Sequence, residues 1–239
     1  RWGKYDYIIG GFRDLWTKPV DMPDSGYVNL VQKGLDVYDG LNVPCVTEVG
    51  GGRFILAGLT HDYGWGGHLA LRELIQFPDG KMGTKWLPEA VPKTGPARSL
   101  DVAAVSPTGT NAVLISFAVS PKSADHGNVA LNLCGGGEAC RFELDLSSRR
   151  AQFAPVKPDG SSDRQKSLRE GNGIHSTRQF AIENLMAVDR PFSVRLIACF
   201  DPKAGGSLVD AEIAGCRTMI AFWPNLAVSE VAFAAQDVG

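Results

Sequence analysis

The sequence predicts an all-β protein built from short strands. Runs rich in β-branched and aromatic residues recur between glycine, proline and aspartate turn signals along its 239 residues. No segment keeps the apolar spacing of an amphipathic helix for more than about three turns. The clearest stretch, Gly51 to Glu89, has the pattern of two consecutive hairpins that end at a proline. Together these features favour a repeat-built β fold.

Each expected strand is an apolar or β-branched run bounded by turn residues. The run from Phe54 follows a triple glycine, and the run from Leu69 is closed by Pro78-Asp79-Gly80. In chain order the expected strands are Tyr5 to Ile9, Tyr27 to Val31, Val43 to Val49, Phe54 to Leu59, Leu69 to Phe77, Ala112 to Val119, Asn128 to Leu133, Arg141 to Leu146, Phe192 to Phe200 and Thr218 to Trp223.

A proline-rich joint divides the chain. Three prolines and a glycine interrupt the strand pattern between Pro88 and Pro96. Residues 1–92 hold too few strands to cover their own sheet edges, so we expect them to supply about two blades of a propeller that other blades complete. Residues 97–239 are long enough for a two-sheet β-sandwich.

Composition excludes several classes of protein. A formal net charge of -2, with scattered Lys and Arg, argues against nucleic-acid or anionic-membrane partners. No apolar run reaches the roughly 18 residues that a membrane-spanning helix needs. Five cysteines are an odd number. Cys134 and Cys140 flank three glycines, and the sequence leaves open a disulfide across a hairpin or two reduced, buried thiols. A zinc site is disfavoured because no second ligand pair stands at zinc spacing.

Several segments resemble glycoside hydrolase family 32, whose members act on fructans and sucrose and combine a five-bladed propeller with a β-sandwich. The resemblance covers most of the chain and keeps the family's order. Pro191 to Leu196 and Asp210 to Ile213 resemble the last sandwich strands. The N-terminal segments that carry the resemblance are Tyr7 to Gly10, Leu35-Asp36, Pro44, Arg53 to Gly58, Trp65-Gly66 and Arg72 to Leu74.

Departures from the family pattern mark a divergent branch. Asn42 to Cys45 replaces the family's Tyr-Ala-Pro-Gln, and Leu71 replaces the proline before its Arg-Glu-Leu. The family's Asn-Asp-Pro nucleophile motif and Glu-Cys acid/base motif do not occur in this sequence. The resemblance therefore implies a C-terminal half without catalytic residues of its own, with the catalytic carboxylates expected upstream or on a second chain.

One group of candidate sugar-binding residues precedes the strand expected from Val43. Asp36, Asp39 and Asn42 place two carboxylates and an amide where an inner propeller strand would begin. Such groups can bind pairs of sugar hydroxyls. The alternative is an Asp-Gly turn in which Asn42 satisfies backbone groups of the loop.

A second group of candidates lies in the loop from Thr60 to His68. His61, Asp62 and Trp65 combine hydrogen-bonding groups with an aromatic face suited to stacking on a sugar ring. The alternative for Trp65 is packing between blades. A metal site formed by His61, Asp62 and His68 would need a turn that brings them together, and we expect no metal or other cofactor.

Two charged pairs are expected to be structural. Arg72 and Glu73 are neighbours on one strand, so their side chains point to opposite faces, and we expect a buried arginine bonded to blade carbonyls or to a carboxylate. Asp210 and Glu212 share a face if their segment is a strand. For these two we expect an exposed edge or salt bridges.

Two functions of different class are consistent with the sequence. The first is the C-terminal portion of a family 32-like glycosidase acting on fructan-like or related plant and microbial glycans, with a glycan and further propeller blades as partners. The second is a noncatalytic carbohydrate-binding or structural β-sandwich module. Because polysaccharide-degrading relatives are usually exported, we expect a periplasmic, cell-surface or extracellular location.

Overall fold

The computed structural model of the chain describes residues 2–3, 7–12, 14–19, 37–38, 41–60, 67–78, 82–97, 99, 112–121, 127–156, 180–182, 185 and 187–236. Within these, 8–12, 14–19, 37–38, 42, 180–182 and 234–236 are described by their backbone alone. The described chain is almost entirely antiparallel β-structure, which confirms the predicted all-β class.

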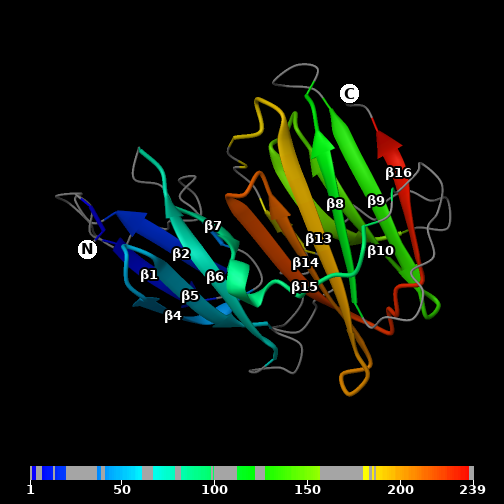
Figure 1. The fold of residues 1–239 in the computed structure, drawn as a ribbon, viewed down its shortest axis with the longest axis horizontal. Helices are drawn as coiled ribbons and strands as arrows, with labels where there is room; N and C mark the ends of the chain where they lie inside the picture. Colours follow the sequence, from blue (N-terminus) through cyan, green and yellow to red (C-terminus); the bar gives the residue numbers. More distant parts are fainter. Residues whose placement is uncertain are drawn as a thin grey trace.

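The N-terminal part contains two antiparallel sheets, seen on the left of Figure 1. The first has the order β1-β2-β3, and the second β4-β5-β6-β7, in which each strand pairs with the next along the chain. This simple meander of four strands is the architecture of a propeller blade. The bounds are β1 (Tyr7–Phe12), β2 (Asp14–Pro19), β3 (Val37–Tyr38), β4 (Asn42–Glu48), β5 (Phe54–Leu59), β6 (Leu69–Gln76) and β7 (Met82–Trp86).

The C-terminal part is a β-sandwich of two sheets, on the right of Figure 1. Their strand orders are β12-β11-β10-β9-β16 and β15-β14-β13-β8. The bounds are β8 (Ala112–Val119), β9 (Asn128–Gly135), β10 (Glu138–Asp145), β11 (Arg150–Pro155), β12 (Phe180–Ile182), β13 (Phe192–Asp201), β14 (Gly206–Ile213), β15 (Arg217–Pro224) and β16 (Glu230–Gln236).

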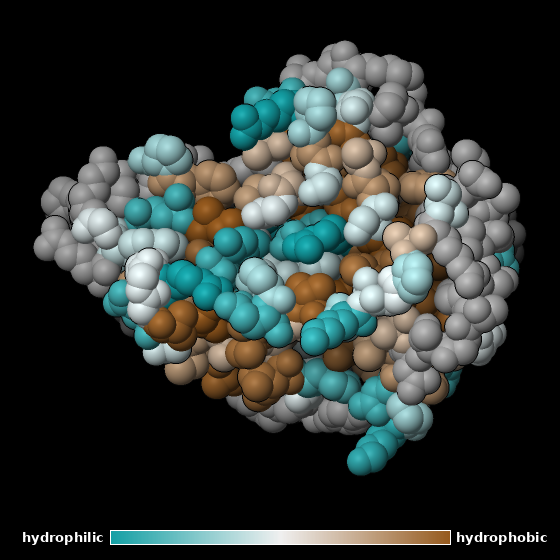
Figure 2. All heavy atoms as spheres, viewed as in Figure 1, coloured by the Kyte–Doolittle hydropathy of each residue, from teal (hydrophilic) through white to brown (hydrophobic). Residues whose placement is uncertain are grey.

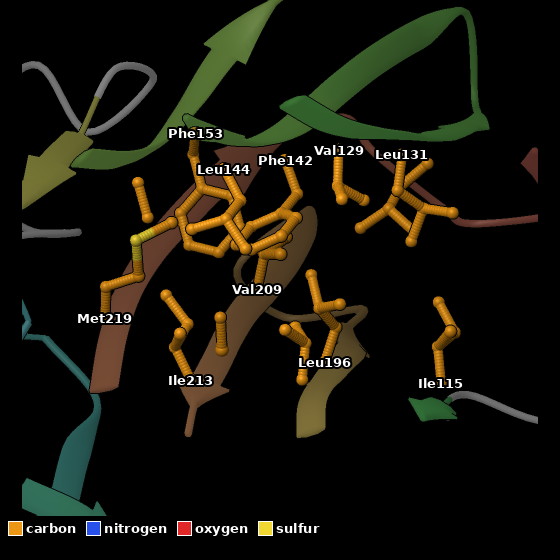
Figure 3. Packing of buried hydrophobic residues seen from close by; sticks show 14 of the residues in the cluster. Ile115, Val129, Leu131, Phe142, Leu144, Phe153, Leu196, Val209, Ile213 and Met219 are labelled. Carbon is orange, nitrogen blue, oxygen red and sulfur yellow. The ribbon is translucent and has the colours of Figure 1, made fainter. Parts of the chain in front are cut away.

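The main core lies between the two sandwich sheets, as Figure 3 shows. Leu131, Phe142 and Phe153 point inward from one sheet and meet Leu196 and Met219 of the other. All five are essentially inaccessible to water. Alternate residues along each strand face this core, which is the pattern that fixes strand register.

A smaller core holds the blade β4–β7 against the sheet β1–β3. The Trp2 and Phe54 rings lie 4.7 Å apart. The Gln76 amide donates hydrogen bonds to the Tyr7 hydroxyl at 2.6 Å and to the Trp2 carbonyl at 3.0 Å. The two N-terminal sheets therefore pack on each other, as the blades of a propeller do.

The two cysteines that flank the glycine turn do not form a disulfide. Cys134 stands opposite Ala139 and Cys140 opposite Leu133 in the β9–β10 hairpin, so the two thiols project from opposite faces of the sheet. Both are free, and Cys140 is fully buried. Of the two alternatives that the sequence left open, the disulfide is therefore wrong and free thiols are confirmed, although Cys134 is only partly buried.

Strand prediction succeeded where the apolar run was continuous. The limits of β5 and β8 agree with prediction, and β1, β4, β6, β9, β10, β13 and β15 differ by a few residues. Prediction missed β2, β3, β7, β11, β12 and β16, and it left β14 conditional. The expected strand Tyr27 to Val31 lies outside the described residues. Residues 92–97 are exposed and without assigned structure, but the domain boundary there stays a prediction.

The described part of the chain contains one short 3-10 helix, Pro88–Ala90. Within that part, no helix has the length and apolar character needed to cross a membrane.

Candidate functional site

The candidate sugar-binding residues are placed only in part. Asn42 is the first residue of β4, and its backbone alone is described. The other five lie outside the described residues, so their role stays a prediction: Asp36, Asp39, His61, Asp62 and Trp65. The described residues that flank them show how both segments are held.

The loop 61–66 is closed at its base by Thr60 and His68. Thr60 donates its backbone N–H to the His68 carbonyl at 2.9 Å. The His68 N–H in turn donates to the Thr60 hydroxyl at 2.8 Å. Thr60 is buried, and the bonds continue the pairing of Leu59 with Leu69 in the β5–β6 hairpin. The candidate loop therefore starts and ends at a fixed point of the blade.

Gly67 is required for this closure. A Cβ atom at Gly67 would lie 2.2 Å from the Thr60 carbonyl oxygen and 2.6 Å from its hydroxyl. Because the nearest atom belongs to the backbone, a side chain there must push the two ends of the loop apart. The sequence offered only a weak signal for this contact, one glycine among several in the loop.

We expect Gly67→Ala to disturb the loop base while the sandwich stays intact. Backbone hydrogen exchange should rise by about tenfold or more at Thr60 and His68 and stay unchanged in β10, because local openings are independent of the distant core. Gly95→Ala is the matched control, since a Cβ there meets open space. Equal protection of Thr60 in Gly67→Ala and wild type would contradict this role.

The side chain of His68 ties the loop base to the sandwich. Its Nε2 lies 3.0 Å from Asp201 Oδ2, and its ring stacks on Phe222 with 6.0 Å between centroids. The other oxygen of Asp201 accepts the backbone N–H groups of Lys203 and Ala204. The hydrogen bond with His68 and, to a smaller extent, those from the two backbone N–H groups hold the pKa of Asp201 below its usual value. The loop is thus anchored to the β13–β14 turn, an interaction that the sequence did not reveal.

The start of β4, where Asn42 lies, has a strained backbone. Leu41 is buried, and a bulge separates Asn42 from Cys45 in the pairing with β5. Within this bulge Val43 has a φ of 52° and is 57% exposed. A β-branched residue avoids positive φ, and bulges and strained residues concentrate where a strand positions a functional group. The backbone at Asn42 is therefore consistent with a binding position.

A buried ion pair joins β6 of the blade to β14 of the sandwich. Arg72 Nη2 lies 2.8 Å from Asp210 Oδ2, and the two side chains are 4% and 14% exposed. Burial raises the pKa of Asp210, while the charge of Arg72 and the Trp86 indole act to lower it. The expectation of a buried Arg72 bonded to a carboxylate is confirmed.

Glu212, two residues further along β14, bonds to both parts of the protein. Its Oε2 accepts the backbone N–H of Trp86 at 2.7 Å, and its Oε1 accepts Nε of Arg195 at 3.0 Å and Nη2 at 2.5 Å. The Arg195 guanidinium also lies 4.8 Å from the centre of the Trp86 ring. The salt-bridge role expected for Asp210 and Glu212 is confirmed. The exposed-edge role is wrong, because β14 lies inside its sheet and packs against the blade.

Further contacts make this junction continuous. Thr84 of β7 donates its backbone N–H to the Cys216 carbonyl at 2.9 Å, and its hydroxyl lies 2.9 Å from that of Thr218. Ile220 of β15 packs into the small core of the blade. The blade and the sandwich therefore share an interior.

The remaining buried carboxylate of the blade, Glu73, is also paired. Arg53 lies 2.8 Å and Lys85 3.0 Å from its two oxygens, and Arg53 also bonds Glu89. The bond from Arg53 holds the pKa of Glu73 below its usual value. A glycosidase acid needs a raised pKa and access to substrate. Neither Glu73 nor the interface pair on β14 meets both conditions. Among the described residues, no group of three or more potential ligands could hold a metal ion.

Comparison with known proteins identifies the fold. No protein-family model matches the sequence, and no curated protein matches it. An exo-inulinase from Aspergillus awamori matches with a TM-score of 0.50 and 15% identity, over 93% of this chain and 46% of its own. The chain shares its fold with a part of that enzyme that makes up less than half of its length. The resemblance seen in the sequence is confirmed at the level of fold.

Two further family 32 structures match more weakly. Both are of a β-fructofuranosidase from Bombyx mori, one of them in complex with sucrose. Their TM-scores are 0.48 and 0.47 at 13% and 14% identity, over 94% of this chain and 44% of theirs. The chain thus spans less than half the length of the family 32 structures that it matches.

Proposed function

We propose that this chain is the C-terminal portion of a glycoside hydrolase that acts on fructan-like or related glycans, and that the catalytic carboxylates lie outside these 239 residues. The observation that carries the proposal is the fold. A four-stranded blade followed by a β-sandwich is shared with an exo-inulinase over nearly the whole chain, which covers less than half of that enzyme.

The described carboxylates support this division of roles. A retaining glycosidase needs a nucleophile and a general acid about 5 Å apart, both facing the scissile bond. Here Asp210 and Glu212 are buried between blade and sandwich and are bonded to arginines. Among the described residues, Asp210 and Glu212 therefore do not supply this nucleophile and acid, and they instead hold the sandwich to the blade.

The contribution of this chain to catalysis is the binding of sugar. Asp36, Asp39 and Asn42 would bond sugar hydroxyls at the start of an inner strand, and His61, Asp62 and Trp65 would contact the sugar from the β5–β6 loop. The closed loop base at Thr60 and the contact from His68 to Asp201 support this role, because fixed ends reduce the entropy that a loop loses when it binds.

We expect Trp65→Ala to weaken binding of an inulin-type oligosaccharide by about tenfold or more, because an aromatic side chain at the centre of a contact supplies much of its free energy. Isothermal titration of the chain with the oligosaccharide measures this. Ser193→Ala on the exposed start of β13 is the control and should bind as wild type does. Unchanged binding by Trp65→Ala would remove the loop from the proposed site.

A noncatalytic carbohydrate-binding module is the second candidate function. The engagement of the buried described carboxylates in ion pairs favours it, since binding needs no free acid pair. Assays of glycan binding and sugar release with the natural polypeptide that contains this chain distinguish the two functions. Binding together with release of sugar supports the glycosidase, and binding without release supports the module.

An exported location belongs to this proposal. It is based on the substrate class, because glycans of plant and microbial origin are met outside the cell.

A further inference from the structure

The start of β4 and the loop 61–66 lie at the same end of the blade. Asn42 of β4 stands opposite Leu59 of β5, and Leu59 in turn stands opposite Leu69 of β6. Because paired residues of an antiparallel sheet are direct neighbours, the backbone at Asn42 lies beside both strands that the loop joins. Both segments that carry candidate sugar-binding residues therefore reach this end of the sheet.

The turn between β13 and β14 of the sandwich reaches the same end of the blade. Asp201 is the last residue of β13 and Gly206 the first of β14. His68, which directly precedes β6, has its Nε2 atom 3.0 Å from Oδ2 of Asp201. Figure 2 shows hydrophilic atoms, in teal, projecting at the lower end of the molecule, where Figure 1 places this turn in orange. The two parts of the protein therefore meet beside the candidate loop.

The carboxylate of Asp201 is fixed by the turn that contains it. Its Oδ1 atom accepts the backbone N–H groups of Lys203 at 2.8 Å and of Ala204 at 3.3 Å. The two strands that flank the turn pair without a bulge over their shared length. These bonds fix the direction of the carboxylate while its other oxygen bonds His68. A side chain that is locked in this way is suited to orienting a second one.

His68 connects this fixed carboxylate to the base of the loop. Its backbone N–H donates to the Thr60 hydroxyl, and its carbonyl accepts the Thr60 N–H. Its ring stacks on Phe222 of β15, which limits the positions that the imidazole can take. The side chains of His68 and Asp201 are 23% and 33% exposed, so water competes only in part with the bond between them. A displacement of Asp201 is therefore felt at the loop end.

We propose that Asp201 is a positioning residue for glycan binding, through which the sandwich holds the sugar-binding loop of the blade by way of His68. Asp201 does not touch the sugar. It lowers the free energy of binding, because a loop whose end is already held in place loses less conformational entropy when the glycan binds. This inference rests on the proposed function, since it needs the loop to bind sugar. It gives the sandwich a part in binding as well as in stability.

Asp201→Asn tests this role with little change to the turn. The amide keeps an oxygen for the backbone N–H groups of Lys203 and Ala204, but it replaces a charge-assisted bond to His68 with at most a neutral one. Isothermal titration with an inulin-type oligosaccharide should show binding weakened by about threefold to tenfold, the usual effect of losing one such bond. Lys203→Gln is the matched control, because it removes a charge from the same turn and keeps the contact with His68. It should bind as wild type does.

Variants of His68 show whether Asp201 acts through it. His68→Phe keeps a ring for Phe222 but cannot bond Asp201, so its binding should be as weak as that of Asp201→Asn. The double variant should bind no more weakly than either single one, because both changes remove the same contact. His68→Gln keeps an N–H donor for Asp201 and should restore most of the affinity. An additive loss in the double variant, or no recovery with His68→Gln, overturns the proposal.

Kinetics of the natural polypeptide distinguish positioning from a general loss of structure. Asp201→Asn should raise KM for inulin by the same factor as the loss in affinity and leave kcat unchanged, because Asp201 does not contact the reacting atoms. A fall in kcat with KM unchanged overturns the positioning role. Equal glycan binding by wild type and Asp201→Asn overturns this role and leaves the proposed function in place. A wild type that binds no glycan overturns both, so the titration of wild type distinguishes the two failures.

Discussion

Arg72→Ala should destabilise the chain by about 3 to 5 kcal/mol at pH 8, because removing one partner of a buried ion pair leaves the other charge without compensation. The partner is Asp210, 2.8 Å away and buried in the junction between blade and sandwich. Urea unfolding followed by tryptophan fluorescence measures the loss, and the chain has tryptophans on both sides of this junction.

The loss should be smaller at pH 5 than at pH 8. Burial already raises the folded-state pKa of Asp210, and removal of Arg72 raises it further. A carboxyl whose folded pKa lies above its unfolded value, about 3.9, costs stability as the pH rises from that value through the folded pKa. At lower pH the folded variant keeps Asp210 protonated and avoids the cost of a buried charge.

Arg53→Ala is the control for Arg72→Ala. Arg53 bonds two carboxylates, but it is 38% exposed, its partner Glu89 is 60% exposed, and its buried partner Glu73 keeps Lys85 at 3.0 Å. Water replaces such contacts, so the change in stability should be much smaller at either pH. A loss for Arg72→Ala below about 1 kcal/mol, or one equal at both pH values, would show that the buried pair does not hold the junction.

Glu212→Ala should have a comparably large effect, about 3 to 5 kcal/mol, because it leaves a buried backbone N–H and an arginine without their acceptor. Its carboxylate accepts hydrogen bonds from Trp86 and Arg195. Glu212→Gln keeps an oxygen for the Trp86 N–H and should lose less. Urea unfolding of wild type, Glu212→Ala and Glu212→Gln at one pH measures the order of their stabilities.

A hydrolysis assay distinguishes the structural role of Glu212 from a catalytic one. In the natural polypeptide, Glu212→Gln should leave kcat unchanged at temperatures where the protein stays folded. Loss of a general acid lowers the rate by about a hundredfold to ten-thousandfold. A fall in kcat of that size with the fold intact would make Glu212 a catalytic residue and contradict its structural role.

The sequence was sufficient for those parts of the fold that depend on local pattern. The limits of β5 and β8 agree with prediction because both are continuous apolar runs between turn residues. β7 was missed because it is short and contains Gly83 and Lys85, which weaken the strand pattern. Packing against the sandwich, where Gly83 approaches the Cys216 carbonyl, overrides that weak local preference.

Contacts between distant segments were beyond the sequence. The spacing of Cys134 and Cys140 left a bridge and free thiols open, and only the strand register shows that the two thiols lie on opposite faces of the sheet. The pairing of Arg72 with Asp210 joins two parts of the chain that no local pattern relates. The anchor between His68 and Asp201 is of the same kind.

The candidate sugar-binding residues were predicted from the chemistry of their side chains, and the structure shows the contacts that hold the segments carrying them. Thr60 and Gly67 close the base of the loop that carries Trp65, and a strained bulge begins at Asn42. Neither the loop base nor the bulge could be predicted from composition, because each depends on how two backbone segments approach each other. Residue type indicated the segments, and packing determined how they are held.

The most direct measurement is the release of fructose from sucrose and inulin by two proteins, the 239-residue chain and the natural polypeptide that contains it, each characterised by its intact mass. We expect the chain, at 25.6 kDa, to bind glycan without releasing fructose, and the natural polypeptide to be heavier and to release it. Release by the chain alone would place the catalytic carboxylates within it. A natural polypeptide of 25.6 kDa that releases nothing would contradict the glycosidase and leave the binding module.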